Sequence, residues 1–259
     1  MRFRPCIDIH NGNVKQIVGS TLRDKNDIAK ENFSSDLGGG YYASLYRSKG
    51  LKGGHIILLN PEGSQYYEAD VDTAKEALSA YEGGLQIGGG MNDKNSARFL
   101  DMGASHIIIT SFVFKDGVIN TDNLKAAVRA VGRKRLVLDL SCRKKGDKYY
   151  IVTDRWQKFT DTELTLDTMG YLSGFCDEFL IHAVDVEGKA NGIETDIAAL
   201  IGDFSEIPVT YAGGIHSYED ISLLSEISGG KADFTIGSAL DIFGGSLEFD
   251  RICELSDKN

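Results

Sequence analysis

The sequence predicts a single α/β domain over residues 1–259, a (β/α)8 TIM barrel built from two duplicated half-barrels. Short apolar runs alternate with segments of helical periodicity, which is the pattern of a parallel sheet with a helix after each strand. In addition, four short motifs occur twice in the same order, with the copies roughly 125 to 131 residues apart. An open doubly wound sheet would explain the alternation but not this repeat. We therefore expect half-barrels of about residues 1–130 and 131–259.

Each repeated motif closes an apolar run, at the point where a strand would meet its loop. The four pairs are Asp8 with Asp139, residues 60–63 with 185–188, the glycine-rich residues 86–90 with 210–214, and residues 109–111 with 236–238. The carboxyl ends of barrel strands meet on one face of the molecule, where active sites are built. The repeat therefore predicts two similar half-sites with two facing carboxylates.

The expected strands are short and rich in Ile, Val and Leu, as are strands that are buried on both faces of a parallel sheet. They cover residues 6–9, 55–59, 85–87, 106–110, 135–140, 178–182, 209–212 and 234–236. Between most of them, apolar residues recur with helical spacing, most clearly in residues 71–81, 97–102, 121–131, 166–173, 196–202 and 218–228. Asp93 and Ser217, just after the glycine clusters, are the expected helix N-caps.

Two connections, residues 20–40 and 141–162, are longer than the others. Residues 141–162 are expected to form a hairpin, because Gly146 and Asp147 separate two strand-like arms. In a barrel both connections leave their strands at the active-site face, where long loops act as lids. For residues 20–40, a lid and an ordinary surface loop are equally consistent with the sequence.

The composition is that of a globular protein with an acidic surface: 42% of the residues are hydrophobic, 25% are charged, and the net charge is −10. This charge argues against nucleic acid or an anionic membrane as a partner, but not against a small anion held by backbone amides. No apolar stretch is long enough for a membrane span, and we expect no targeting segment before the first strand. Four widely spaced cysteines indicate reduced thiols in a cytoplasmic protein, which we expect to be monomeric.

The glycine clusters are expected to bind phosphate. Each follows a buried strand and precedes a helix, so backbone amides can approach an anion closely and the helix N-terminus adds favourable partial charge. Neighbouring barrel loops lie side by side, so each cluster combines with the end of the next strand. The expected residues are Gly88, Gly89, Gly90 and Ser111 for one phosphate, and Gly213, Gly214, Gly237 and Ser238 for the other. Two such sites predict a substrate with a phosphate at each end.

Asp8 and Asp139 are the expected catalytic pair. They end strands one and five, which lie opposite each other in an eight-stranded barrel, so both would point at the middle of a ligand held between the phosphates. Opposed carboxylates suit acid–base proton transfer. The alternative is a structural role in salt bridges, since a buried carboxylate without partners is costly.

Four further residues are candidates for substrate binding. His182 and Asp185 follow the sixth strand, although His182 is equally consistent with a core histidine. Arg143 and Trp156 lie in the long connection of residues 141–162, from which they could clamp a ligand by ion pairing and stacking.

Several of these segments resemble a known family. The barrels of histidine biosynthesis are similar to this chain at residues 6–12, 86–90, 137–139 and 211–214. The eukaryotic-type branch of the phosphoribosylformimino-aminoimidazole-carboxamide ribotide isomerase resembles it at residues 14–19, 140–144, 179–183 and 235–245. The resemblance extends from Pro5 to about Gly245, nearly the whole chain.

The resemblance implies a barrel without cofactor or metal that catalyses an Amadori rearrangement of a bis-phosphorylated aminoaldose to its aminoketose. It also implies that Asp8 is the general base that removes the C2 proton and that Asp139 is the general acid that opens the ribose ring. Commoner bacterial members carry His-Thr after strand six. Here Ala183 follows His182, so the usual threonine is absent and Asp185 is the candidate substitute.

Two other functions remain open. The cyclase subunit of imidazole glycerol phosphate synthase shares the duplicated barrel and both aspartates, but it usually carries a Thr-Ser-Met-Asp-Arg-Asp-Gly stretch after strand six that this chain lacks. A non-catalytic phosphate-ligand-binding barrel would be expected to lose one of the two aspartates, and both are present. The isomerase is therefore the preferred interpretation.

Overall fold

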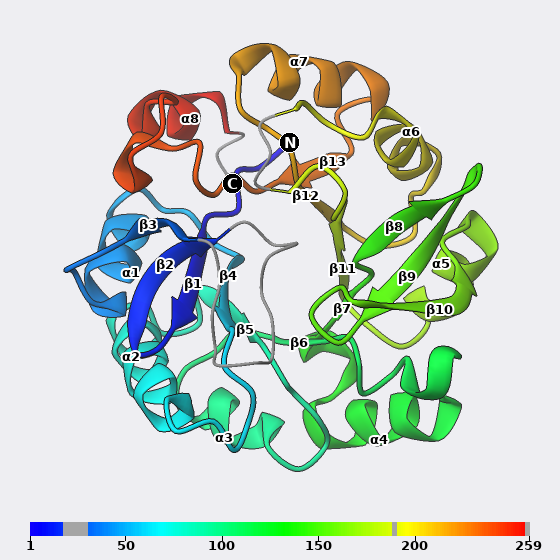
Figure 1. The fold of residues 1–259 in the computed structure, drawn as a ribbon, viewed down its shortest axis with the longest axis horizontal. Helices are drawn as coiled ribbons and strands as arrows, with labels where there is room; N and C mark the ends of the chain where they lie inside the picture. The colour runs from blue at the N-terminus through cyan, green and yellow to red at the C-terminus, as the bar shows by residue number, and fades with distance from the viewer. Residues whose placement is uncertain (18–30, 188–190, 257–259) are drawn as a thin grey trace.

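The computed structural model describes residues 1–17, 31–187 and 191–256. Parallel strands form a ring in the centre of the molecule (Figure 1). They are β1 (Cys6–His10), β4 (Gly54–Leu58), β5 (Leu85–Gly88), β6 (Ile107–Ile109), β7 (Leu136–Asp139), β11 (Glu178–His182), β12 (Val209–Ala212) and β13 (Ala232–Phe234). Ahead of β1, Phe3 forms a parallel bridge with Phe234, and the Arg4 N–H donates to the Phe234 carbonyl over 2.8 Å. The first and last strands are thus joined, and the predicted barrel is confirmed.

Helices pack around the outside of the ring (Figure 1). They are α1 (Gly39–Ser48), α2 (Tyr67–Ala80), α3 (Ser96–Asp101), α4 (Thr121–Val131), α5 (Leu166–Ser173), α6 (Thr195–Asp203), α7 (Tyr218–Ile227) and α8 (Phe249–Leu255), with short 3-10 turns at Lys115–Gly117, Arg133–Arg135 and Asp241–Phe243. The expected helices are present, but α1 and α8 are additional. Helix α1 begins with two glycines, which are poor helix formers. It forms because Tyr42, Ala43 and Tyr46 are buried against the barrel.

The last strand lies two residues earlier than predicted, at Ala232–Phe234 instead of residues 234–236. Asp233 made this segment read as a loop, because aspartate is depleted in strands. In the structure Arg2 and Arg4 hold the Asp233 carboxylate, with nitrogen–oxygen distances of 2.9 and 2.8 Å. These ion pairs offset the cost of burying the charge, so the strand can continue through it.

One of the two expected N-caps is correct. Ser217 caps α7 in a reciprocal capping box with Asp220. Asp93 is not a cap, since α3 begins only at Ser96. The turn before α3 is instead organised by Asn92, whose side-chain oxygen accepts from the backbone N–H groups two and three residues later, over 2.8 and 3.2 Å.

The two long connections contribute antiparallel strands. The predicted hairpin is confirmed: β8 (Cys142–Lys145) and β9 (Lys148–Thr153) pair around Gly146, which has a φ of 65°. A third strand that was not expected, β10 (Lys158–Glu163), pairs with β9. On the other side of the barrel, β2 (Asn13–Ile17) and β3 (Glu31–Ser34) extend the sheet from β1. Much of the segment 20–40 lies outside the described residues, so its expected role as lid or surface loop is not tested.

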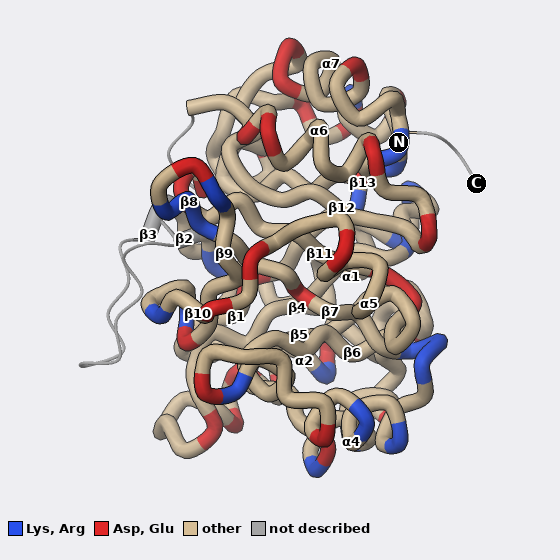
Figure 2. The backbone as a smooth tube through the Cα atoms, turned by 90° about the vertical axis from the view of Figure 1, so that its right-hand side faces the viewer, with Lys and Arg blue, Asp and Glu red and all other residues tan. Residues whose placement is uncertain are grey.

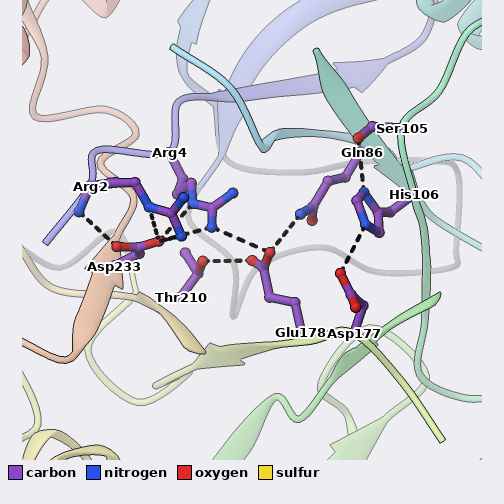
Figure 3. Close-up of polar contacts among 9 residues, drawn as sticks. All are labelled: Arg2, Arg4, Gln86, Ser105, His106, Asp177, Glu178, Thr210 and Asp233. Carbon is purple, nitrogen blue, oxygen red and sulfur yellow. Dashed lines mark hydrogen bonds and ion pairs between the residues drawn. The ribbon is translucent and has the colours of Figure 1, made fainter. Parts of the chain in front are cut away.

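The interior of the ring is filled in layers. Where the strands begin, the Glu178 carboxylate accepts from Gln86 (3.1 Å) and Thr210 (2.8 Å) and lies 3.4 Å from the Arg4 guanidinium (Figure 3). Arg4 also pairs with Asp233, so these buried charges compensate one another. The next layer is apolar and contains Ile57, Ile108, Val137, Leu180 and Ala212. Together these layers fill one end of the barrel and leave the other end for a ligand.

Acidic and basic residues are interspersed along the chain on the side of the molecule seen in Figure 2. In the view of Figure 2, both signs occur on the helices and on the strands of the β8–β10 sheet, without one continuous basic stripe. This agrees with the net charge of −10. Within the part of the chain that the structure describes, no helix is long and apolar enough to cross a bilayer.

Candidate active site

A cavity of about 1170 Å³ opens at the carboxyl ends of the barrel strands. Most of the residues predicted from sequence lie in its wall: Asp8, Asp139, Gly89, Gly90, Ser111, Trp156, His182, Gly213, Gly214, Gly237 and Ser238. Both halves of the chain therefore contribute to one site. Three predicted residues, Gly88, Arg143 and Asp185, do not line the cavity.

Asp8 lies near the end of β1, on the inner side of the barrel. Burial raises the pKa of its carboxyl group to about 7, and the nearby negative charge of Glu187 adds to this effect. The positive charge of His182 acts in the opposite direction. A carboxylate with a pKa near neutrality can both accept and return a proton under ordinary conditions.

Asp139 ends β7 and is surrounded by hydrogen-bond donors. Its Oδ1 accepts from the Ser141 hydroxyl over 2.8 Å and lies 3.5 Å from His182 Nδ1, and its Oδ2 accepts from the Thr110 hydroxyl over 3.1 Å. Burial alone would raise the pKa of this carboxyl group. The contacts with His182, Ser141 and Thr110 outweigh burial and bring the pKa below its usual value. Asp8 and Asp139 thus have the same side chain, but their pKa values are shifted in opposite directions.

Trp156 reaches the cavity from the loop between β9 and β10. Its indole N–H donates to the Ser141 hydroxyl over 2.9 Å, and its ring centroid lies 5.7 Å from that of His182. The loop holds three consecutive residues in the left-handed region: φ is 51° at Asp154, 55° at Arg155 and 66° at Trp156. Such a conformation is strained for residues other than glycine and is typical of functional loops. Trp156 thus lies in the wall of the cavity, on the long loop in which the sequence places it.

The two glycine clusters adopt the same conformation in the two halves of the barrel. Gly89 has a φ of 101° and Gly213 a φ of 116°. A Cβ atom at Gly89 would lie 2.1 Å from the carbonyl oxygen of Leu58, and one at Gly213 would lie 2.7 Å from that of Ala183. The positive φ and the lack of room for a Cβ atom therefore both require glycine at each position. The match supports the internal repeat inferred from the sequence.

The loops after β6 and β13 carry open backbone amides at matching positions. Among the described residues, the N–H groups of Ser111 and Phe112 donate no hydrogen bond within the protein, and the same holds for Ser238 and Ala239. All four residues line the cavity. Pairs of successive free amides beside a glycine turn are a common way of binding phosphate. The cavity therefore offers one anion cradle in each half.

The three predicted residues outside the cavity have other roles in this structure. Arg143 Nε donates to Asp185 Oδ1 over 2.9 Å, and the Lys144 N–H donates to the other oxygen of the same carboxylate over 2.8 Å. This pair ties β8 to the segment after β11. At Gly88 a Cβ atom would lie only 3.0 Å from the side chains of Ile57 and Ile108, so this glycine permits close packing inside the barrel.

Several residues of the cavity wall were not singled out from the sequence: Glu187, Thr110, Ser141 and His55. Glu187 and Thr110 do belong to the repeated motifs, which was a usable signal. His55 lies within an apolar run, and nothing in the sequence marks it as a site residue. Burial lowers its pKa to about 3, with a further contribution from His182, so this imidazole is neutral. In the part of the chain that the structure describes, no three His, Cys, Asp or Glu side chains are arranged to hold a metal ion.

The amino-acid sequence of this chain is similar to those of proteins of one known family. Residues 2–247 match the model of a family described as histidine biosynthesis protein. A chloroplastic protein of Medicago truncatula, named 1-(5-phosphoribosyl)-5-((5-phosphoribosylamino)methylideneamino)imidazole-4-carboxamide isomerase, is 53% identical over 253 residues, which cover 96% of this chain and 80% of that protein. Isomerases of the same name from Yarrowia lipolytica and Saccharomyces cerevisiae are 44% and 43% identical, over 99% of this chain and 98% of theirs.

Proposed function

The chain belongs to the histidine biosynthesis protein family, and from this premise we propose that it is the isomerase for which its relatives are named. It is an intramolecular aldose–ketose isomerase that converts a bis-phosphorylated aminoaldose, the imidazole-carboxamide ribotide of the relatives' name, into its aminoketose. The observation that carries this proposal is the pair Asp8 and Asp139, which lie in one cavity with oppositely shifted pKa values. An Amadori rearrangement needs both a base and an acid.

The cavity supports a substrate with two phosphates. One cradle follows β5 and β6, at Gly89, Gly90 and Ser111, and the other follows β12 and β13, at Gly213, Gly214, Gly237 and Ser238. In the ring these two pairs of strands are separated by β4 and β1 on one side and by β7 and β11 on the other. A ligand that spans both cradles therefore has its centre beside the strands that carry Asp8 and Asp139.

The proposed reaction has two stages, opening of the ribose ring and then transfer of a proton from C2 to C1. An acid on the Asp139 side of the cavity protonates the ribose ring oxygen, the ring C–O bond breaks, and the nitrogen lone pair forms a C=N bond. Asp8 then removes the C2 proton, and the ketose forms as C1 is protonated and the C2 hydroxyl gives up its proton. A pKa of about 7 suits Asp8 for this role, because the ionised base is well populated at neutral pH and the proton it takes can be returned.

The two rival functions have less support. A cyclase would share the barrel and both aspartates, but the relatives are named as isomerases and the chain lacks the stretch that is usual in the cyclase after strand six. A phosphate-binding barrel without activity would not need a carboxylate pair with opposite pKa shifts. Nothing in the geometry favours either rival.

We also propose that the enzyme is a monomer and acts in the cytoplasm. The four cysteines are free, and Cys6, Cys142 and Cys176 are buried, as is typical of proteins in a reducing compartment. Sedimentation at working concentration tests the first proposal, and microscopy of the tagged protein in its own cells tests the second.

Replacing each carboxylate by its amide tests the proposed function. Asp8→Asn and Asp139→Asn should each reduce ketose formation from the aminoaldose by at least about 1000-fold, because each removes a carboxylate on which the proton transfers depend. Substrate affinity should stay within about tenfold, equivalent to about 1.4 kcal/mol, because the phosphate cradles remain. Asp101→Asn, on the exposed end of α3, is the matched control. Near-full activity of either Asp8→Asn or Asp139→Asn would contradict the assignment.

A further inference from the structure

The surroundings of Asp139 conflict with its expected role as a neutral acid. An indole nitrogen can only donate, so the Ser141 hydroxyl must accept from Trp156 and direct its own hydrogen towards Asp139. Asp139 therefore receives this hydrogen bond whatever the protonation state of its neighbours. Thr110 and His182 add contacts at the two oxygens. Such an arrangement suits an ionised carboxylate, which accepts hydrogen bonds but has no proton to give.

We propose that the proton that opens the sugar ring is carried by His182, and that ionised Asp139 holds His182 in its charged form. This proposal deepens the function proposed above and depends on it. Asp139 is then the residue that charges and orients the donor, and the imidazolium is the donor itself.

The geometry leaves one ring nitrogen of His182 for the substrate. Nδ1 lies 3.5 Å from Asp139 Oδ1, within the distance of an ion pair. Nε2 has no hydrogen-bond partner among the residues that the structure describes, and His182 lines the cavity. The Trp156 ring packs beside the imidazole and restricts its orientation. A histidine that is fixed through one nitrogen and open at the other is the usual arrangement of an acid–base histidine.

The charges around His182 favour its protonated form. Burial by itself lowers the pKa of His182, but Asp139 on β7, Glu187 after β11 and Asp8 on β1 all raise it, and the net shift is upward. From β4, the neighbouring His55 stays neutral and adds no competing positive charge. Among the described groups that face His182, the carboxylates therefore determine its charge.

The protons balance with His182 as donor. The imidazolium gives its Nε2 proton to the ribose ring oxygen as the ring C–O bond breaks and the nitrogen lone pair forms the C=N bond. His182 is then neutral. After Asp8 has moved the proton from C2 to C1, the C2 hydroxyl loses its proton as the ketone forms, and His182 takes that proton up. Both residues end in their starting states, as an isomerisation requires.

His182→Asn tests this proposal, because asparagine can keep an N–H directed at Asp139 but cannot carry a transferable proton. Turnover of the variant should fall by about 100-fold or more while its KM changes little. The wild-type enzyme should lose activity at alkaline pH, where His182 gives up its proton, and the activity of the variant should not show this alkaline loss. His106→Asn is the control, since His106 pairs with Asp177 near the opposite end of the barrel. An His182→Asn enzyme with full turnover and an unchanged pH profile would overturn the proposal and return the acid to Asp139.

Nitrogen-15 spectra of the histidine rings give a readout that does not depend on activity. The signal missing from His182→Asn belongs to His182, and in the wild-type protein it should show both ring nitrogens protonated at pH 7. In Asp139→Asn the same signal should titrate at lower pH. A neutral His182 at pH 7 in the wild-type protein would overturn the proposal even if the enzyme is an isomerase. A wild-type protein that forms no ketose would instead refute the proposed function itself.

Discussion

Asp8 illustrates how a single residue acquires its chemistry from distant parts of the chain. The sequence predicted a functional aspartate here because its motif recurs at Asp139. It could not predict the upward shift in the pKa of Asp8, which comes from burial in the finished barrel and from the charge of Glu187. Glu187 lies nearly 180 residues after Asp8 in the sequence. The same holds for His182, which the sequence left open between core and site. Pairwise electrostatics between strands need the assembled fold.

The raised pKa of Asp8 predicts a pH-dependent cost in stability. The unfolded carboxyl group ionises near pH 4 and the folded one near pH 7, so between these values the folded state holds a proton that the unfolded state has lost. Stability should therefore decrease as pH rises through this window, by about 1.4 kcal/mol for each pH unit.

Asp8→Asn has no such proton and should be more stable than the wild-type protein at pH 8, with a smaller difference at pH 5. Denaturant unfolding of both proteins at the two pH values measures this. An equal difference at pH 5 and pH 8 would show that Asp8 titrates normally.

At the level of elements, the turns determine where the binding groups lie. Gly146 and Asp147 predicted the β8–β9 hairpin correctly, because a left-handed glycine suits a tight turn. Strand β10 was missed, since its sequence Lys-Phe-Thr-Asp-Thr-Glu is mostly polar and its pairing with β9 contains a register shift. The strain in the β9–β10 loop, which directs Trp156 into the cavity, has no sequence signature, because none of its left-handed residues is glycine.

The glycine turns give a second prediction at this level. Gly213→Ala should raise KM for the bis-phosphorylated substrate at least about tenfold, because its Cβ would force the turn away from the Ala183 carbonyl and displace the phosphate cradle. Gly132→Ala is the matched control: it also has positive φ, at 80°, but open space around its Cβ and no place in the cavity.

Both variants should lose stability through backbone strain, of about 1 kcal/mol or more, but only Gly213→Ala should lose affinity. Steady-state kinetics and thermal unfolding separate the two effects. If Gly213→Ala binds substrate as tightly as Gly132→Ala does, this turn does not hold a phosphate.

At the level of the whole molecule, the duplicated motifs made the fold predictable. Alternating strands and helices are common to several α/β architectures, and only the half-length repeat distinguished a barrel from an open sheet. The structure repeats this symmetry in atomic detail, with Gly89 against Leu58 in one half and Gly213 against Ala183 in the other.

The junction between the two chain ends could not be predicted. Arg4 and Asp233 are 229 residues apart in sequence and meet only when the ring is complete (Figure 3). From the local sequence alone, each of these charged residues is expected at the surface or in a loop. For the same reason the last strand was placed two residues too late. Contacts that depend on closure of the barrel are not visible in local patterns of hydrophobicity.

The central claim is that one chain, with two phosphate cradles and an acid–base pair between them, isomerises an aminoaldose. The most direct test is to mix the purified protein with the bis-phosphorylated aminoaldose ribotide, without glutaminase or added metal, and to follow formation of the ketose. We predict multiple turnovers by the wild-type protein and none by Asp8→Asn at equal concentration. If the aminoaldose stays unchanged, while the ketose supplied together with ammonia is cyclised, the account is wrong and the chain is a cyclase.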